Sequence, residues 1–124
     1  MVYKLVIPGK LSNLNDYINA LDRNRYKGGQ LKRDNETKVI CEILSQFGRL
    51  RITKPVRMSY TWIEPNKRRD LDNISSFGRK VIQDAFVKAG TLKNDGWNNI
   101  KGFSDRFEVD RKNPRIEVEI IEIC

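Results

Sequence analysis

The chain has 124 residues, enough for one domain with a single hydrophobic core and too few for two. Its content of 39% hydrophobic and 32% charged residues is typical of a globular protein with a polar surface and excludes a disordered chain. The net charge of +8 favours a polyanionic partner, and the lack of histidine excludes Ser-His and Cys-His catalysis.

The first half of the chain predicts one strand and two helices. Residues 2–7 (VYKLVI) form a short β-type run. A helix is expected to begin at Ser12 or Asn13, either of which can cap it, because apolar residues then recur at three- and four-residue steps. A polar basic loop is expected over residues 22–29, followed by a second amphipathic helix over residues 30–47.

The second half predicts a strand, a long helix and two more strands. Residues 56–64 alternate apolar and polar side chains, which is typical of a strand with one buried face. Residues 71–89 carry the clearest apolar stripe in the chain and form a helix. A hairpin-like turn is expected at Asp95-Gly96, then strands over 99–109 and 115–123. We therefore predict a single α+β or α/β domain over residues 1–124, with helices packed on a small mixed sheet of about four strands.

Nothing in the sequence indicates export or a membrane span, because the apolar run at the N-terminus is too short for either. The two cysteines, Cys41 and Cys124, form no CxxC pair, and without histidine a zinc site is not expected. We interpret both as free thiols in a reducing cytoplasm.

The stretch KRRDLDN, residues 67–73, divides the chain by charge. Up to Arg69 there are 15 Lys and Arg against 6 Asp and Glu, whereas from Asp70 onward there are 9 against 10. Such a stretch is either a solvated surface turn or a place where carboxylates hold a metal beside cations that hold a polyanion.

Asp70 and Asp72 stand where a predicted strand gives way to a predicted helix. Either carboxylate can cap that helix, which is the simplest alternative to a metal site. One cap needs only one carboxylate, however, and Asn73 follows directly to brace the pair. A third carboxylate, Asp95, lies just beyond the far end of the helix.

Asp95 reaches the other two only if the chain returns along the helix, because a helix of this length spans roughly 28 Å. If the three carboxylates converge, their mutual repulsion calls for a cation between them. Oxygen ligands of this kind suit Mg²⁺, with Mn²⁺ as a possible substitute, and such an ion can activate water and stabilise charge on a phosphodiester.

The sequence resembles the RusA family of Holliday-junction resolvases, small endodeoxyribonucleases associated with phages and prophages. The resemblance covers most of the chain, from VIPGKLSNLNDY to the strand RIEVEI. It is strongest over RRDLDN, KVIQDAF and AGTLKND, where an R-x-D-x-D-N box precedes a helix and a later Asp. It implies that Asp70, Asp72 and Asp95 form the catalytic metal site.

The resemblance also implies a catalytic lysine on the helix, and two ways of counting place it differently. Counting forward from Asn73 reaches Ser76, whereas counting back from Asp84 in DAF reaches Lys80. The difference is one helical turn, which keeps nearly the same face of the helix. We therefore assign the role of stabilising the negative charge of the cleaved phosphate to Lys80, with Arg79 as a weaker substitute. A solvated helix face is the alternative for Lys80, and Asp84 can simply pair with it.

Two groups of cations are expected to hold DNA phosphates, which positions DNA without reading its sequence. Lys67, Arg68 and Arg69 lie beside the aspartates, and a solubilising turn is the alternative for them. The second group is the basic stretch Arg23, Arg25, Lys27, Lys32 and Arg33.

The leading hypothesis is a Mg²⁺-dependent endonuclease that resolves four-way junctions by paired cuts. The family acts as a homodimer, which supplies two sites related by a two-fold axis. A nuclease for flaps or forks on the same scaffold and a catalytically silent junction-binding protein remain as alternatives. The chain lacks the sequence features of RRM and KH domains, which disfavours an RNA-binding module.

Overall fold

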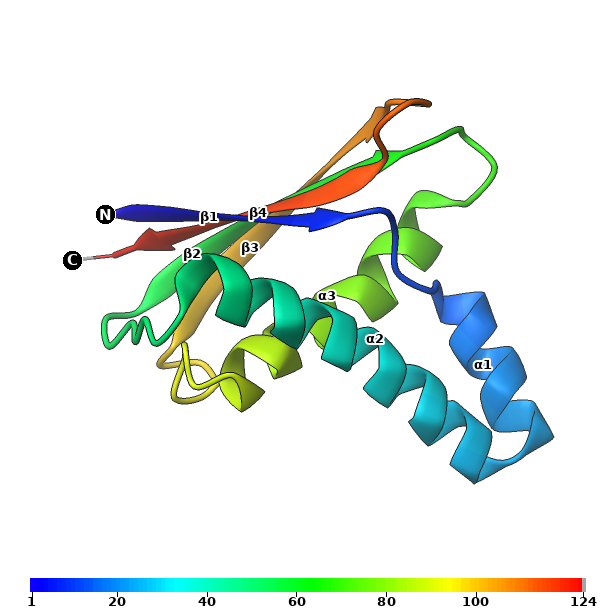
Figure 1. Ribbon diagram of the computed structural model, residues 1–124, viewed down its shortest axis with the longest axis horizontal. Coiled ribbons are helices and arrows are strands. Elements are labelled where there is room, and N and C mark those ends of the chain that lie inside the picture. The colour runs from blue at the N-terminus through cyan, green and yellow to red at the C-terminus, as the bar shows by residue number, and fades with distance from the viewer. Residues whose placement is uncertain (124) are drawn as a thin grey trace.

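The computed structural model describes residues 1–123 as a four-stranded mixed sheet with three helices (Figure 1). Cys124, for which a free thiol was predicted, lies outside these residues, and Cys41 is a free, exposed thiol. The predicted α+β domain with a small mixed sheet is confirmed. The elements are β1 (Val2–Pro8), α1 (Leu14–Arg23), α2 (Arg25–Phe47), β2 (Val56–Glu64), α3 (Leu71–Lys88), β3 (Ile100–Val109) and β4 (Arg115–Glu122).

The strands lie in the order β1-β4-β2-β3. β4 runs antiparallel to both of its neighbours, β1 and β2, whereas β2 and β3 run parallel. A parallel pair needs a crossover connection, and α3 supplies it as the middle of a β2-α3-β3 unit. This unit places the start of α3 and the carboxyl ends of β2 and β3 at one end of the sheet.

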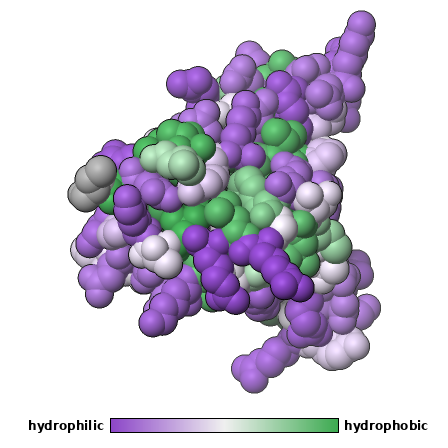
Figure 2. Space-filling view, turned by 60° about the vertical axis from the view of Figure 1, so that its left-hand side comes forward, coloured by the Kyte–Doolittle hydropathy of each residue, from purple (hydrophilic) through white to green (hydrophobic). Residues whose placement is uncertain are grey.

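Helices α2 and α3 pack against one side of the sheet, α1 packs on these two helices, and the core lies between the helices and the sheet (Figure 1). The alternation predicted for β2 decides which side is buried. Val56, Met58, Tyr60 and Trp62 are almost fully buried, while the residues that alternate with them, Arg57, Ser59 and Thr61, are more exposed. In the space-filling view of Figure 2 the surface is mainly hydrophilic, with apolar side chains gathered across the middle of the face shown.

α3 contributes the largest apolar helix face to this core. Its buried residues recur at three- and four-residue steps, as the sequence predicts, and close approach to the sheet is helped by Gly78. A Cβ atom at Gly78 would lie 2.6 Å from the Trp62 ring. Helix α3 therefore packs directly on Trp62, near the carboxyl end of β2.

The basic loop predicted over residues 22–29 is wrong, because two helices meet there with only Asn24 between them. The backbone N–H of Asn24 closes α1 on the Ala20 carbonyl, and its side chain caps α2 by accepting the Lys27 N–H at 2.7 Å. Gly28 is buried against Leu21, where a Cβ atom would come within 2.2 Å of a methyl group. The glycine that suggested a loop thus serves close helix packing.

The turn predicted at Asp95-Gly96 does not form a hairpin. These residues lie in the connection from α3 to β3, and β3 pairs with β2 in parallel register. Within residues 1–123, none of the helices is both long and apolar enough to cross a bilayer.

Candidate nucleic-acid and metal site

Asp70 and Asp72 lie at the carboxyl end of β2, where the chain turns into α3. Asp70 is the N-cap residue of α3 by its backbone angles, yet its side chain makes no capping hydrogen bond. Asp72 lies in the first turn, and both residues are exposed. Neither carboxylate takes part in an ion pair or side-chain hydrogen bond within the described part of the chain. The capping alternative therefore lacks the hydrogen bond that defines it for Asp70.

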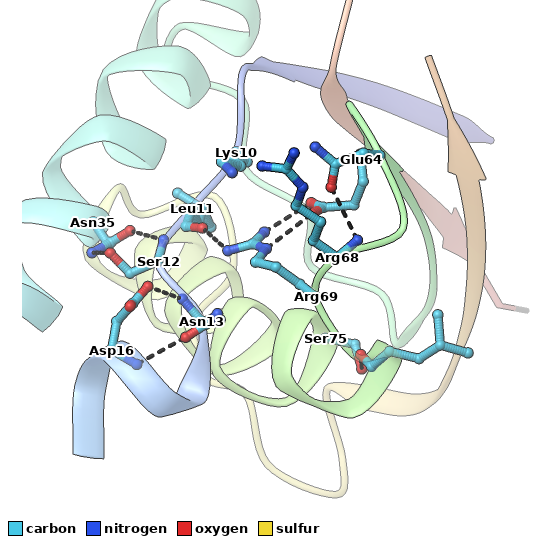
Figure 3. A network of polar contacts seen from close by, with 12 residues as sticks. Lys10, Leu11, Ser12, Asn13, Asp16, Asn35, Glu64, Arg68, Arg69 and Ser75 are labelled. Atoms are coloured by element: carbon cyan, nitrogen blue, oxygen red, sulfur yellow. Dashed lines mark hydrogen bonds and ion pairs between the residues drawn. The ribbon is translucent and has the colours of Figure 1, made fainter. Parts of the chain in front are cut away.

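Arg69 holds the loop that carries these aspartates. Its Nε and Nη2 donate to the two carboxylate oxygens of Glu64 at 2.9 and 2.8 Å, and its Nη1 donates to the Leu11 carbonyl at 2.9 Å (Figure 3). The side chains of Arg69 and Glu64 are only 15% and 8% exposed. Three N–H groups of Arg69 are therefore bound within the protein, which gives it a structural role that the sequence did not indicate.

The segment before α1 is fixed to the same region from the other side. Asn35 of α2 accepts the Ser12 N–H at 2.9 Å and donates to the Ser12 hydroxyl at 3.0 Å (Figure 3). Asn13, one of the two predicted caps, forms a reciprocal capping box with Asp16. Leu11, Arg69 and Glu64 thus join the N-terminal loop, the loop before α3 and the end of β2.

Lys67 and Arg68 are the cations nearest in sequence that stay exposed. The backbone N–H of Arg68 donates to the Asn66 side chain at 3.0 Å, which shapes the turn. Neither cationic side chain has an ion-pair partner among residues 1–123. Exposed cations beside exposed carboxylates form a surface on which a phosphate and a metal ion can be held together.

A cavity of about 550 Å³ opens beside Asp70, between the start of α3 and the ends of β2 and β3. This placement follows a general rule for parallel strands, whose carboxyl ends border ligand sites. Its lining combines apolar and charged side chains: Glu64, Asn66, Lys67, Arg69, Asp70, Leu71, Ile74, Phe107, Glu108 and Val109.

Lys80 lies on the exposed side of α3, away from the first turn. Its Nζ is 3.2 Å from Asp84 Oδ1 and 3.9 Å from Asp95 Oδ2, and its side chain is 61% exposed. Since Lys80 follows Asp72 by eight residues, the two lie about 12 Å apart along the helix axis. Asp95 is therefore grouped with Lys80 rather than with Asp70 and Asp72.

The convergence expected of Asp70, Asp72 and Asp95 is not present in the single chain. Within residues 1–123, no three Asp, Glu or Cys side chains gather in a group suited to a metal ion. The chain does return along α3, as expected, but through β3, which begins five residues after Asp95. Asp95 thus stays beside the second half of the helix.

Asp84 links Lys80 to helix α2. Its second oxygen lies 3.0 Å from Lys32 Nζ, and Lys32 is also 3.7 Å from Glu36. Partial burial raises the pKa of Asp84, but hydrogen bonds from Lys32 and Lys80 outweigh it and hold that pKa below its ordinary value. Burial lowers the pKa of Lys32, and Asp84 and Glu36 more than offset this and raise it.

Arg79 is held against β3 by a residue that sequence reasoning missed. Its guanidinium forms an ion pair with Asp105 and lies 4.6 Å from the centre of the Phe103 ring. Asp105 also accepts the indole N–H of Trp62 at 2.9 Å. The alternation of β3 puts Phe103, Asp105 and Phe107 on one face, which is the only sequence signal for this role.

The second basic group is split by the fold. Arg23, Arg25 and Lys27 are exposed where α1 meets α2, at the end of the helix pair that projects from the sheet (Figure 1). Lys32 is engaged with Asp84, and Arg33 donates to the Gln30 side chain at 3.3 Å. The DNA-binding role of both groups of cations stays a prediction.

Comparison with known protein families and with curated protein sequences finds no match to this chain.

Proposed function

We propose that the protein is a metal-dependent endodeoxyribonuclease that cuts branched DNA and resolves four-way junctions, as the RusA family that its sequence resembles does. One observation carries the proposal: Asp70 and Asp72 have no partner among the described side chains and stand beside Lys67 and Arg68, which have none either. Carboxylates and cations left unpaired at adjacent positions favour a ligand that brings both a cation and an anion.

A hard divalent ion such as Mg²⁺, with Mn²⁺ as a substitute, fits these donors. Mg²⁺ is commonly bound through one or two carboxylates and by phosphate oxygens of the substrate, which two exposed aspartates beside a phosphate-binding surface can satisfy. When bound there, such an ion supplies an activated water and charge stabilisation at the phosphorus. Asp70 and Asp72 would hold it, and Asp95 stays a predicted third ligand that the single chain keeps with Lys80.

The remaining residues have positioning roles in this proposal. Lys67 and Arg68 bind phosphates next to the cleaved one, while Arg69 fixes the loop through Glu64. Lys80 lies further along α3, where its exposed ammonium group meets the DNA backbone or the negative charge that develops on cleavage. Paired cuts across a junction call for two copies of the chain, so the proposal includes a homodimer that acts on DNA in the cytoplasm.

Cleavage of a labelled synthetic four-way junction tests the proposal. In Mg²⁺ the wild-type protein is expected to make paired symmetric cuts, and Asp72→Asn is expected to abolish cutting while junction binding survives. Glu119→Gln is the matched control, because Glu119 is exposed on strand β4 and has no role in the proposed site. It should cut like the wild type.

Two other outcomes would replace the proposal. Tight junction binding without cutting in Mg²⁺ or Mn²⁺ would favour a silent junction-binding protein. Faster cutting of flaps or forks than of junctions would favour the branched-DNA nuclease, for which the same carboxylates serve. Linear duplex of the same sequence provides the baseline in both comparisons.

A further inference from the structure

The cavity beside Asp70 has an apolar interior that the proposed chemistry does not use. Phe107 and Ile74 form its inner wall, and Leu71 and Val109 stand at its mouth. The latter two are unusually exposed for apolar side chains, at 56% and 49%. An apolar hollow of this kind stabilises a flat, weakly hydrated group that displaces its water.

The same cavity carries charge on its rim. Lys67 and Asp70 line it together with the apolar residues, and Glu108 and Asn66 add an acceptor and an amide. Glu64 also lines it, but both of its oxygens are bound by Arg69 and are not free for a ligand. The combination fits a ligand with an apolar planar body and an attached anion that a metal ion joins to Asp70, which is the chemistry of a nucleotide.

We propose that this cavity receives an unpaired nucleobase of the DNA whose phosphate is held at Asp70 and Asp72. The inference rests on the proposed function, since it takes the phosphate position from there. Only the sugar separates a base from its own phosphate, so a base swung from the strand at that phosphate reaches a hollow lined by the same Asp70. The volume of about 550 Å³ accommodates a base and lies within the range of ordinary ligand sites.

Occupancy of the cavity gives the protein a reason to prefer branched DNA. Moving a base out of the stack of a continuous duplex costs a few kcal/mol of free energy. The cost is lowest for a base that is already unpaired at a branch, flap or gap. The cavity therefore selects for unpaired bases next to the cut without reading four-way geometry. Phe107 supplies the aromatic face on which single-stranded bases commonly stack.

The test uses 2-aminopurine placed at successive positions around the branch point of a synthetic junction, and as a paired base in a linear duplex. Binding is measured with Ca²⁺ in place of Mg²⁺, an oxygen-binding ion that can join the aspartates to the phosphate, and a denaturing gel verifies that the DNA stays uncut. We expect a change in 2-aminopurine emission at one position beside the branch point, where a base leaves its pair on binding, and none in the duplex. Leu71→Ser and, separately, Val109→Ser should abolish that change and weaken junction binding about five- to tenfold, with duplex affinity unchanged.

Leu44→Ser is the matched control, because Leu44 is 49% exposed on α2 and does not line the cavity. It should leave the emission change intact. Both test residues are exposed, and circular dichroism of each variant verifies folding before binding is compared.

The proposal is overturned if both cavity variants keep the wild-type emission change, or if they weaken duplex and junction binding equally. It is also overturned if they convert a dimer into a monomer in sedimentation, since the cavity would then be a contact between two copies. Junction cutting with no cavity-dependent emission would leave the nuclease proposal standing and remove this one. A cavity-dependent emission change with no cutting in Mg²⁺ would support the cavity as a base-binding site and remove the nuclease proposal.

Discussion

Arg69 and Glu64 form a two-point ion pair in the loop that leads to the exposed aspartates, and a third hydrogen bond from Arg69 reaches Leu11, 58 residues earlier in the chain. Both side chains are largely buried. Removal of one partner from such a pair leaves the other charge without compensation, which commonly costs several kcal/mol.

Arg69→Ala should therefore lower the free energy of unfolding by about 3 kcal/mol. Arg68→Ala is the matched control, because the Arg68 side chain adjoins Arg69 in sequence but is exposed and unpaired. This variant should change the free energy of unfolding by less than about 0.5 kcal/mol. Urea denaturation of the two variants provides the measurement. If both variants changed the free energy of unfolding equally, the Arg69–Glu64 pair would contribute little to stability. The predicted role of Arg69 in binding phosphate would then be favoured.

The helix-cap alternative for Asp70 is tested by stability alone. Because Asp70 makes no side-chain cap hydrogen bond, Asp70→Ala should cost clearly less than Asn13→Ala, which removes one half of a complete capping box. Loss of a true N-cap typically costs about 1 kcal/mol. Thermal and urea unfolding compare the two. A cost for Asp70→Ala as large as that for Asn13→Ala would support the capping role and weaken the metal site.

Asp84 should make stability depend on acid pH. Its pKa in the folded chain lies below the ordinary value of 3.8, because Lys32 and Lys80 favour the ionised form despite partial burial. The stabilisation is therefore fully present above pH 3.8 and is lost as the pH falls through the lower folded value. Asp84→Asn should be less stable than the wild type at pH 7, and the difference should shrink steadily below pH 3.8. Unfolding curves at several pH values measure it, and a difference that does not change with pH would contradict this account.

Two helical glycines should respond to alanine in opposite directions. Gly78→Ala would place a methyl group 2.6 Å from the buried ring of Trp62, so we expect destabilisation by about 1–3 kcal/mol. Gly29→Ala meets only the flexible end of Arg33 at 3.2 Å, and higher helix propensity should stabilise the chain by up to about 1 kcal/mol. Differential scanning calorimetry distinguishes the two signs. A stabilised Gly78→Ala variant would show that Trp62 has room to move.

Sequence periodicity predicted the secondary structure well because burial imposes it. The alternation in β2 and the apolar stripe of α3 mark the same interface from its two sides, and both are confirmed. The loop predicted over residues 22–29 was wrong because glycine is typical both of turns and of close contacts between helices. Only the packing of Leu21 against Gly28 in the folded chain shows which of the two applies here.

The site was harder to predict than the fold. The position of Asp70 and Asp72 at a strand-to-helix junction followed from local pattern and is confirmed. The placement of Asp95 depends on where β3 begins relative to α3, which is a property of the tertiary path. The engagement of Arg69 with Glu64 and of Arg79 with Asp105 depends on contacts between elements, so a sequence that shows cations in a row gives no sign of which ones are already neutralised.

Among residues 1–123, strand β1 pairs along its length with β4 alone, and Val2 lies opposite Ile121. The N-terminus of a chain leaves the ribosome first. The partner of β1 therefore does not exist until the residues between Pro8 and Glu122 have been synthesised. Contacts so distant in sequence slow folding, because pairing β1 with β4 closes the longest loop between any two paired strands of residues 1–123. The last β-ladder to assemble should therefore be the one that holds the first strand, and in the nascent chain the apolar residues of β1 would stay open to chaperones until synthesis of β4 is complete.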